Sequence, residues 1–207
     1  MRKTNVSRWS AMMIAFVLIL SSLAAPVRAL EPNSSASLII TGLDPDVKAT
    51  FYKIIGVNLT KGEPADPMYI WTEEVASYVL SEYPAYVNTD SGKKAVADSF
   101  FSMDGGTRAA FLKAVRDNCR TQLDNSDYKT ATADAQGTIS ARLPLGYYLI
   151  EVGENYLLMT GSVFPKYENG AWVAVGSTAS AKQEASSDLT LTTDGTSVTV
   201  GELVNYT

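Results

Sequence analysis

From Tyr128 onward the chain repeats one pattern: short runs of β-branched and aromatic residues, separated by glycine, proline, asparagine or aspartate. Such runs are typical of β-strands, and the residues between them are those that tight turns require. Several short strands at this spacing predict two packed antiparallel sheets rather than a helical or α/β fold. The strands expected in this part are 128–133, 138–143, 147–152, 156–164, 172–179 and 189–193.

Two more strands are predicted near the start of the domain. Residues 37–41 are largely β-branched and end at a glycine. Residues 47–57 alternate and carry apolar side chains on both faces, which is typical of a central strand. The alternation predicts one face with Val47, Ala49, Phe51, Ile55 and Val57, and the other with Thr50, Tyr52 and Ile54.

The middle of the chain changes to a helical period, which predicts a pair of helices inserted into the β fold. Thr72 is the expected N-cap of the first helix, and Glu73 and Glu74 follow in its first turn, where carboxylates complement the helix dipole. The second helix is expected at 106–123, and 96–103 is either a short helix or a turn. The apolar face of the second helix is formed by Phe111, Leu112, Val115, Cys119 and Leu123.

The N-terminus has the three parts of a secretory signal peptide: a basic start, an apolar run at 11–20 and a small-x-small sequence that ends at Ala29. The alternative is a membrane anchor, but the run is too short to cross the hydrocarbon core, and Pro26 and Arg28 interrupt it. We therefore expect cleavage after Ala29. The mature chain is then extracellular, secreted or attached to the cell wall, with no membrane segment.

Charge and composition exclude several functions. Residues 1–29 hold four of the 17 basic residues and none of the 22 acidic ones, so the mature chain carries 13 basic against 22 acidic residues, a net charge of −9. Such a chain is poorly suited to bind nucleic acid. It also has no histidine, the commonest general base and metal ligand. We expect no enzyme, no catalytic or metal-binding residues and no cofactor.

The single cysteine, Cys119, excludes a disulfide within the chain. Its place on the apolar face of the second helix predicts a buried thiol that packs as a small hydrophobic group rather than a reactive one.

Composition also divides the chain. We expect a signal peptide at 1–29, a polar leader at 30–37 and a β-sandwich domain at 38–184 with a helical insertion at about 70–123. The small and polar sequence around 181–188 is interpreted as a boundary, and 185–207 as the start of a second, truncated β domain.

The segment LPLGYYLIE at 143–151 resembles collagen-adhesin B-type repeats, in which a Gly-Tyr-Tyr-Leu strand ends in a glutamate. The order of elements is similar to the first domain of Gram-positive fimbrial (pilin) subunits: SLIITGLDP, ATFYKIIGV, a helix that begins with Trp71, a second helix and the hairpin YENGAW. The resemblance covers about 38–207. It implies an immunoglobulin-like, collagen-adhesin B-type β-sandwich and a structural role in a pilus.

The resemblance implies two kinds of lysine chemistry, of which the first is an intramolecular Lys–Asn isopeptide assisted by a buried carboxyl group. Glu151 stands where the family places that carboxyl group. However, the first strand has Ile39 and Ile40 where the family has its lysine, and the last strand of the domain has no asparagine. Lys53 would fit only an unusual geometry. We therefore predict no isopeptide in this domain, with Glu151 an ordinary carboxylate at the end of a strand.

The second kind is the lysine through which a sortase joins one pilin subunit to the next. Lys166 lies in Val-Phe-Pro-Lys, which is similar to the family's Val-Tyr-Pro-Lys motif, whereas Lys182 has the family's spacing after Trp172. We favour Lys182, because it lies near the domain boundary, and both are alternatively ordinary surface lysines. Residues 1–207 contain no LPxTG-type signal, so the chain is either a fragment or not anchored in this way.

The alternative function is an adhesin that binds a glycan or a host matrix protein without polymerising. Exposed aromatic side chains would form such a binding surface, and Trp71, Tyr83, Tyr86 and Trp172 are the candidates. Of these, Trp71 is expected in the core, because it begins an amphipathic segment.

Overall fold

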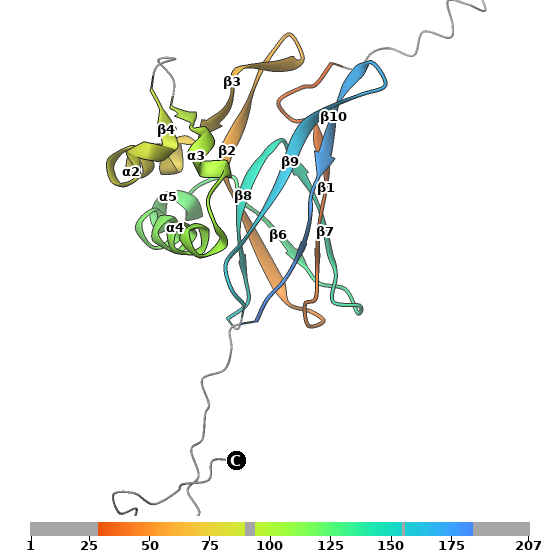
Figure 1. The fold of residues 1–207 in the computed structure, drawn as a ribbon. Coiled ribbons are helices and arrows are strands. Elements are labelled where there is room, and N and C mark those ends of the chain that lie inside the picture. The colour runs from red at the N-terminus through yellow and green to blue at the C-terminus, as the bar shows by residue number, and fades with distance from the viewer. Residues whose placement is uncertain (1–28, 90–93, 155, 184–207) are drawn as a thin grey trace, which may run out of the picture.

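The computed structural model describes residues 29–89, 94–154 and 156–183. Within them the chain is mainly β, with two multi-stranded sheets and a group of short helices gathered on one side (Figure 1). The predicted mainly β class is therefore confirmed. Residues 1–28 of the predicted signal peptide, the predicted strand 189–193 and the predicted second domain from 185 lie outside the described residues.

The smaller sheet has three strands. β1 (Ser35–Thr41) pairs antiparallel with β7 (Ile139–Pro144) and parallel with β11 (Thr178–Ser180). Along β1, the alternate residues Leu38 and Ile40 are fully buried, as the two-residue period of a strand requires when one face covers a core.

The larger sheet is built around β2 (Lys48–Thr60), the strand predicted to be central. β2 pairs with β8 (Gly146–Val152) on one side and with β6 (Lys129–Thr132) and then β3 (Glu63–Trp71) on the other. The remaining strands of this sheet are β9 (Met159–Glu168), β10 (Ala171–Gly176), β5 (Ala95–Val96) and β4 (Val87–Asn88).

One hydrophobic core fills the space between the two sheets. Both sheets contribute alternate residues to it, which identifies it as the core of the sandwich. Its fully buried members include Leu38, Ile40, Ala49, Phe51, Ile139, Ile150 and Val163.

The helices cover the outer face of the larger sheet and form a second core with it (Figure 1). They are α2 (Glu73–Glu82), α3 (Asp98–Phe101), α4 (Gly105–Asn118) and α5 (Arg120–Asp124). No helix within the described ranges is long and apolar enough to span a membrane. This second core contains Tyr52, Ile54, Ile55, Trp71, Val75, Val79, Phe100, Phe111, Leu112, Val115, Cys119, Leu123 and Leu149.

The two predicted helices are found, with corrections at their ends. Thr72 precedes α2 as expected, but its hydroxyl donates to the Lys53 carbonyl at 3.2 Å and makes no capping hydrogen bond. Asp104 caps α4 through the backbone N–H groups of the first turn. The predicted second helix is interrupted at Cys119, where α4 ends and α5 begins. Residues 96–103, for which the sequence allowed either a short helix or a turn, contain the short helix α3.

One predicted face of β2 is wrong at a single residue. The pairing of β2 with β8 shifts register between Lys53 and Ile55, so the two-residue alternation breaks there. As a result, Ile55 lies in the helical core together with Ile54, whereas Phe51 lies between the sheets as expected.

The segment predicted as a polar leader is part of the fold. Leu30 is only 6% exposed and belongs to the core between the sheets, and its N–H donates to the Gly62 carbonyl at 2.9 Å. The Ser34 carbonyl accepts from the N–H of Leu145 at 3.0 Å, and β1 begins at the next residue. Residues 30–34 thus connect the β2–β3 turn to the β7–β8 corner and close one end of the sandwich.

Candidate functional site

Lys182 lies two residues after the end of β11, near the last of the described residues. Its side chain is exposed, but the backbone on both sides of it is held. The N–H of Ala181 donates to the Thr41 carbonyl at 2.9 Å, and the Lys182 carbonyl accepts from Leu157 at 3.0 Å. Gln183 forms an isolated antiparallel bridge with Tyr156.

A cluster of three polar side chains surrounds this bridge, and we call it the exit clamp: Asp44, Tyr156 and Gln183. The Tyr156 hydroxyl donates to Asp44 Oδ2 at 2.8 Å and accepts from the backbone N–H of Asp44 at 2.9 Å. Gln183 Nε2 lies 3.4 Å from Asp44 Oδ2 and 3.3 Å from the Tyr156 hydroxyl. The clamp therefore ties the β1–β2 turn, the β8–β9 connection and the chain exit together.

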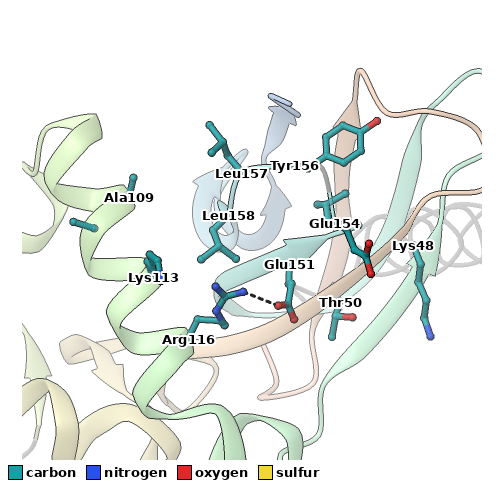
Figure 2. A pocket seen from close by; sticks show the side chains of 13 residues that line it. Lys48, Thr50, Ala109, Lys113, Arg116, Glu151, Glu154, Tyr156, Leu157 and Leu158 are labelled. Atoms are coloured by element: carbon teal, nitrogen blue, oxygen red, sulfur yellow. Dashed lines mark hydrogen bonds and ion pairs between the residues drawn. The ribbon is translucent and has the colours of Figure 1, made fainter. Parts of the chain in front are cut away.

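A groove of about 780 Å³ lies between α4 and the β8–β9 connection, next to the exit clamp (Figure 2). One wall is the outer side of α4 and the other is formed by the ends of β2 and β8. Leu157, which is 46% exposed, is an apolar residue of its lining. The groove is lined by Lys48, Thr50, Ala109, Ala110, Lys113, Arg116, Glu151, Val152, Gly153, Glu154, Tyr156, Leu157 and Leu158.

Glu151, the predicted isopeptide-associated carboxylate, is held by two arginines on the helices. Arg116 Nη1 donates to Oε1 at 3.0 Å, which Figure 2 shows across the groove, and Arg120 Nη1 lies 2.8 Å from Oε2. Arg120 also donates to Asp124 at 2.9 Å. Glu151 thus anchors the helices to the sheet.

The network continues into the sheet through Tyr52. Its hydroxyl donates to Asp124 Oδ1 at 2.9 Å, and its side chain is almost fully buried. Burial, followed by this hydrogen bond to a carboxylate, raises the pKa of Tyr52 to about 12.

The orientation of β8 separates Glu151 from the strands on which an isopeptide would form. Tyr148, Ile150 and Val152 point between the sheets, and Tyr147 and Leu149 point to the helices. Glu151 shares the helical side, whereas β1 and β11 lie in the opposite sheet. The residues of those two strands include neither a lysine nor an asparagine.

Lys166, the second candidate for intersubunit linkage, lies on β9 near the β9–β10 hairpin, where Val173 is its cross-strand partner. Its ammonium group pairs with Glu168, and the Lys166 side chain is 62% exposed. The two candidates therefore differ: Lys166 has a carboxylate partner on a projecting hairpin, and Lys182 stands on backbone held by both neighbours.

The four aromatic candidates have different environments. Trp71 is 2% exposed and donates its indole N–H to the Tyr86 carbonyl at 3.0 Å, so the prediction that it lies in the core is confirmed. Tyr83 and Tyr86 pack against the helical core. Trp172 pairs across the hairpin with Tyr167, a residue that is 60% exposed, and their ring centroids are 5.3 Å apart. Trp172 itself is half-buried and packs against the sandwich core.

Cys119 is buried, as predicted, with 2% of its surface exposed. Burial raises the pKa of its thiol, which keeps the group in its unreactive neutral form. In the parts of the chain that the structure describes, no group of three or more acidic or cysteine side chains is arranged to hold a metal ion.

No family model matches the chain, and no curated protein matches it.

Sequence reasoning missed the exit clamp and the arginine partners of Glu151. For Arg116 and Arg120 a signal existed, since residues four apart on a helix share one face. For the clamp there was none, because Asp44, Tyr156 and Gln183 come from three segments that only the tertiary fold brings together.

Proposed function

We propose that this chain belongs to a structural pilus subunit, with a domain of the collagen-adhesin B type that is exported and joined to other copies by a sortase. The single observation that carries the proposal is the position of Lys182. It is exposed two residues after the last described strand, and the backbone around it is hydrogen-bonded to the domain. The subunit has no turnover chemistry of its own.

The linkage is an acyl transfer. The sortase cleaves a peptide bond of the donor subunit and holds the new acyl group as a thioester on its cysteine. The neutral ε-amine of the acceptor lysine attacks the carbonyl carbon, the C–S bond breaks and the thiol leaves. An amide forms, the proton that the amine loses is taken up by the departing thiol, and nothing is oxidised or reduced.

Mechanical reasoning supports Lys182 over Lys166 as the acceptor. Tension that enters at Lys182 and continues toward higher residue numbers bypasses both sheets. Tension that enters at Lys166 would load β9, β10 and β11 and the hydrogen bonds that hold them. A domain outside the path of tension needs no covalent staple, in agreement with the absence of lysine and asparagine from β1 and β11.

Peptide mapping of native cell-wall polymer tests this function. We expect a branched peptide in which Lys182 is bonded to the C-terminal end of another subunit, and loss of the polymer ladder in Lys182→Arg. Lys166→Arg is the matched control and should polymerise normally. Polymer in which both lysines are unmodified would refute the linkage.

A second candidate function, an adhesin without polymerisation, is favoured by one observation, the exposed Tyr167 that lies against the half-buried Trp172 at the β9–β10 hairpin. Aromatic faces of this kind stack on apolar faces of ligands. Residues 30–207 would then bind a glycan array or collagen, and Trp172→Ala would abolish binding. Such binding in cells that form no polymer ladder would favour this function over the first.

A further inference from the structure

The exit clamp holds the backbone next to the exposed Lys182, because Gln183 is bound to Asp44 and Tyr156. Of its members, Tyr156 makes the most contacts: its hydroxyl both donates to and accepts from Asp44, and its backbone bridges to Gln183. The residue Tyr156 is only 8% exposed, so water competes poorly for these hydrogen bonds.

Three consecutive residues are fixed at this point. Ala181 is bound to Thr41 of β1, Lys182 to Leu157, and Gln183 to Tyr156. The side chain of Lys182 is nevertheless exposed. The Lys182 side chain therefore extends into solvent from a backbone that hydrogen bonds hold in place.

We propose that Asp44, Tyr156 and Gln183 are positioning residues for acyl transfer to Lys182, and that they act by immobilising the backbone of residues 181–183. The inference rests on the proposed function and adds to it the residues that determine which lysine is selected. A reacting group on a fixed backbone loses less freedom when it meets its partner, so the transfer is faster. Lys166 lies on a different part of the molecule and is unaffected by the clamp.

The first test uses trypsin, which cleaves after Lys182 only when the local backbone opens. Tyr156→Phe removes the hydroxyl and both of its hydrogen bonds to Asp44. We expect cleavage after Lys182 in the mature chain to become roughly three- to tenfold faster, the change that loss of hydrogen bonds of ordinary strength gives a local opening equilibrium. Tyr167→Phe, on the exposed hairpin, is the matched control and should cleave at the wild-type rate.

The second test measures transfer itself. The mature chain is incubated with a sortase and a fluorescent peptide that carries an LPxTG-type motif, and labelling of each lysine is followed by mass spectrometry. Tyr156→Phe should lower the rate at Lys182 severalfold, and Asp44→Asn should retain most of the rate, because the amide oxygen still accepts from the phenol. Ile139→Val, which loses a methylene in the sandwich core and removes no hydrogen bond of the clamp, controls for a general loss of stability.

The outcomes separate the two claims. If Lys182→Arg abolishes labelling but Tyr156→Phe labels at the wild-type rate, the positioning role is refuted and the proposed function stands. If Lys182→Arg labels as the wild type does, Lys182 is not the acceptor, and both claims fail. An unchanged trypsin rate in Tyr156→Phe also refutes the clamp, and an equal loss of labelling in Ile139→Val reduces it to a stabilising contact.

Discussion

Arg120 holds Glu151 through one nitrogen, with Nη1 at 2.9 Å from Oε1 and 2.8 Å from Oε2. Arg120 belongs to α5 and Glu151 to β8, so this contact joins the helical insertion to the sheet. Because Arg116 binds the same carboxylate from α4, one acidic residue connects both helices to the strand. This explains why a strand that is apolar over most of its length carries a glutamate next to its last residue.

Replacing Glu151 with glutamine should loosen the helices without unfolding the sandwich. The amide keeps a hydrogen-bond acceptor but loses the charge, and both arginines are partly exposed, so we expect a loss of about 1 kcal/mol of unfolding free energy. Hydrogen exchange should increase in α4 and α5 more than in β1 and β7. Lys113→Met, which removes a pair confined to α4, is the control and should leave α5 unchanged.

The pH dependence of stability should report Tyr52. Its pKa is about 12 in the fold and 10 in the unfolded chain, so the unfolded state loses its proton first as the pH rises. The contribution of Tyr52 is fully present below pH 10 and is lost between pH 10 and about 12.

Chemical denaturation at pH 9, 10 and 11 measures this effect. Tyr52→Phe should flatten the decline, and Asp124→Asn should lower the pKa of Tyr52, because the neutral amide no longer repels the phenolate. Lys53 has the opposite effect: burial lowers its pKa, so its contribution to stability improves as the pH rises toward 10.5. A decline of the same size in Tyr52→Phe would contradict the assignment.

The sequence predicted those segments of the fold whose own residues show a clear helical or strand period. The Gly-Tyr-Tyr-Leu run of β8 and the Phe111 face of α4 have clear periods, and the bounds of β8 and the start of α4 were predicted to within one residue. β3 was missed, because Pro64 and Pro67 interrupt it, and prolines are tolerated only where a strand has a free edge. β3 has such an edge, since among the described residues its outer side pairs with β5 alone, at Ile70.

The candidate site also combines residues that the sequence could indicate with residues that it could not. Lys182 and Lys166 were chosen as candidates by spacing and local motif, which are properties of the linear chain. The partners of these residues depend on distant segments: Tyr156 is 112 positions from Asp44, and no periodicity in either segment indicates the contact. The bulge at Lys53 in β2 likewise depends on pairing with β8, so the misplacement of Ile55 could not be avoided from the sequence.

Leu30 should matter for stability although it precedes the first strand. Its side chain fills the end of the sandwich core, so Leu30→Ser should cost about 2 kcal/mol of unfolding free energy. Leu30→Met, which conserves volume, should cost less than half of that. Thermal unfolding of mature protein that begins at Leu30 or at Glu31 gives a second measurement, and equal melting temperatures for all of these proteins would show that the segment is not part of the core.

The mature protein should have the mass of its sequence, without the loss of ammonia that accompanies an intramolecular Lys–Asn amide. Such a bond requires both residues on adjacent strands beside a carboxyl group. In this domain β1 and β11 supply neither residue, and Glu151 lies on the helical side of β8, bound to two arginines.

Lys53 is half-buried on β2, but its cross-strand neighbour on β8 is Tyr148 rather than an asparagine. Burial is the leading cause that lowers the pKa of Lys53. Intact mass spectrometry of residues 30–207, followed by recovery of the unmodified Lys53 peptide after digestion, measures this directly. A mass deficit of one ammonia that survives in Lys53→Met would place a bond elsewhere in the domain, whereas a deficit that this substitution removes would identify Lys53 as its donor.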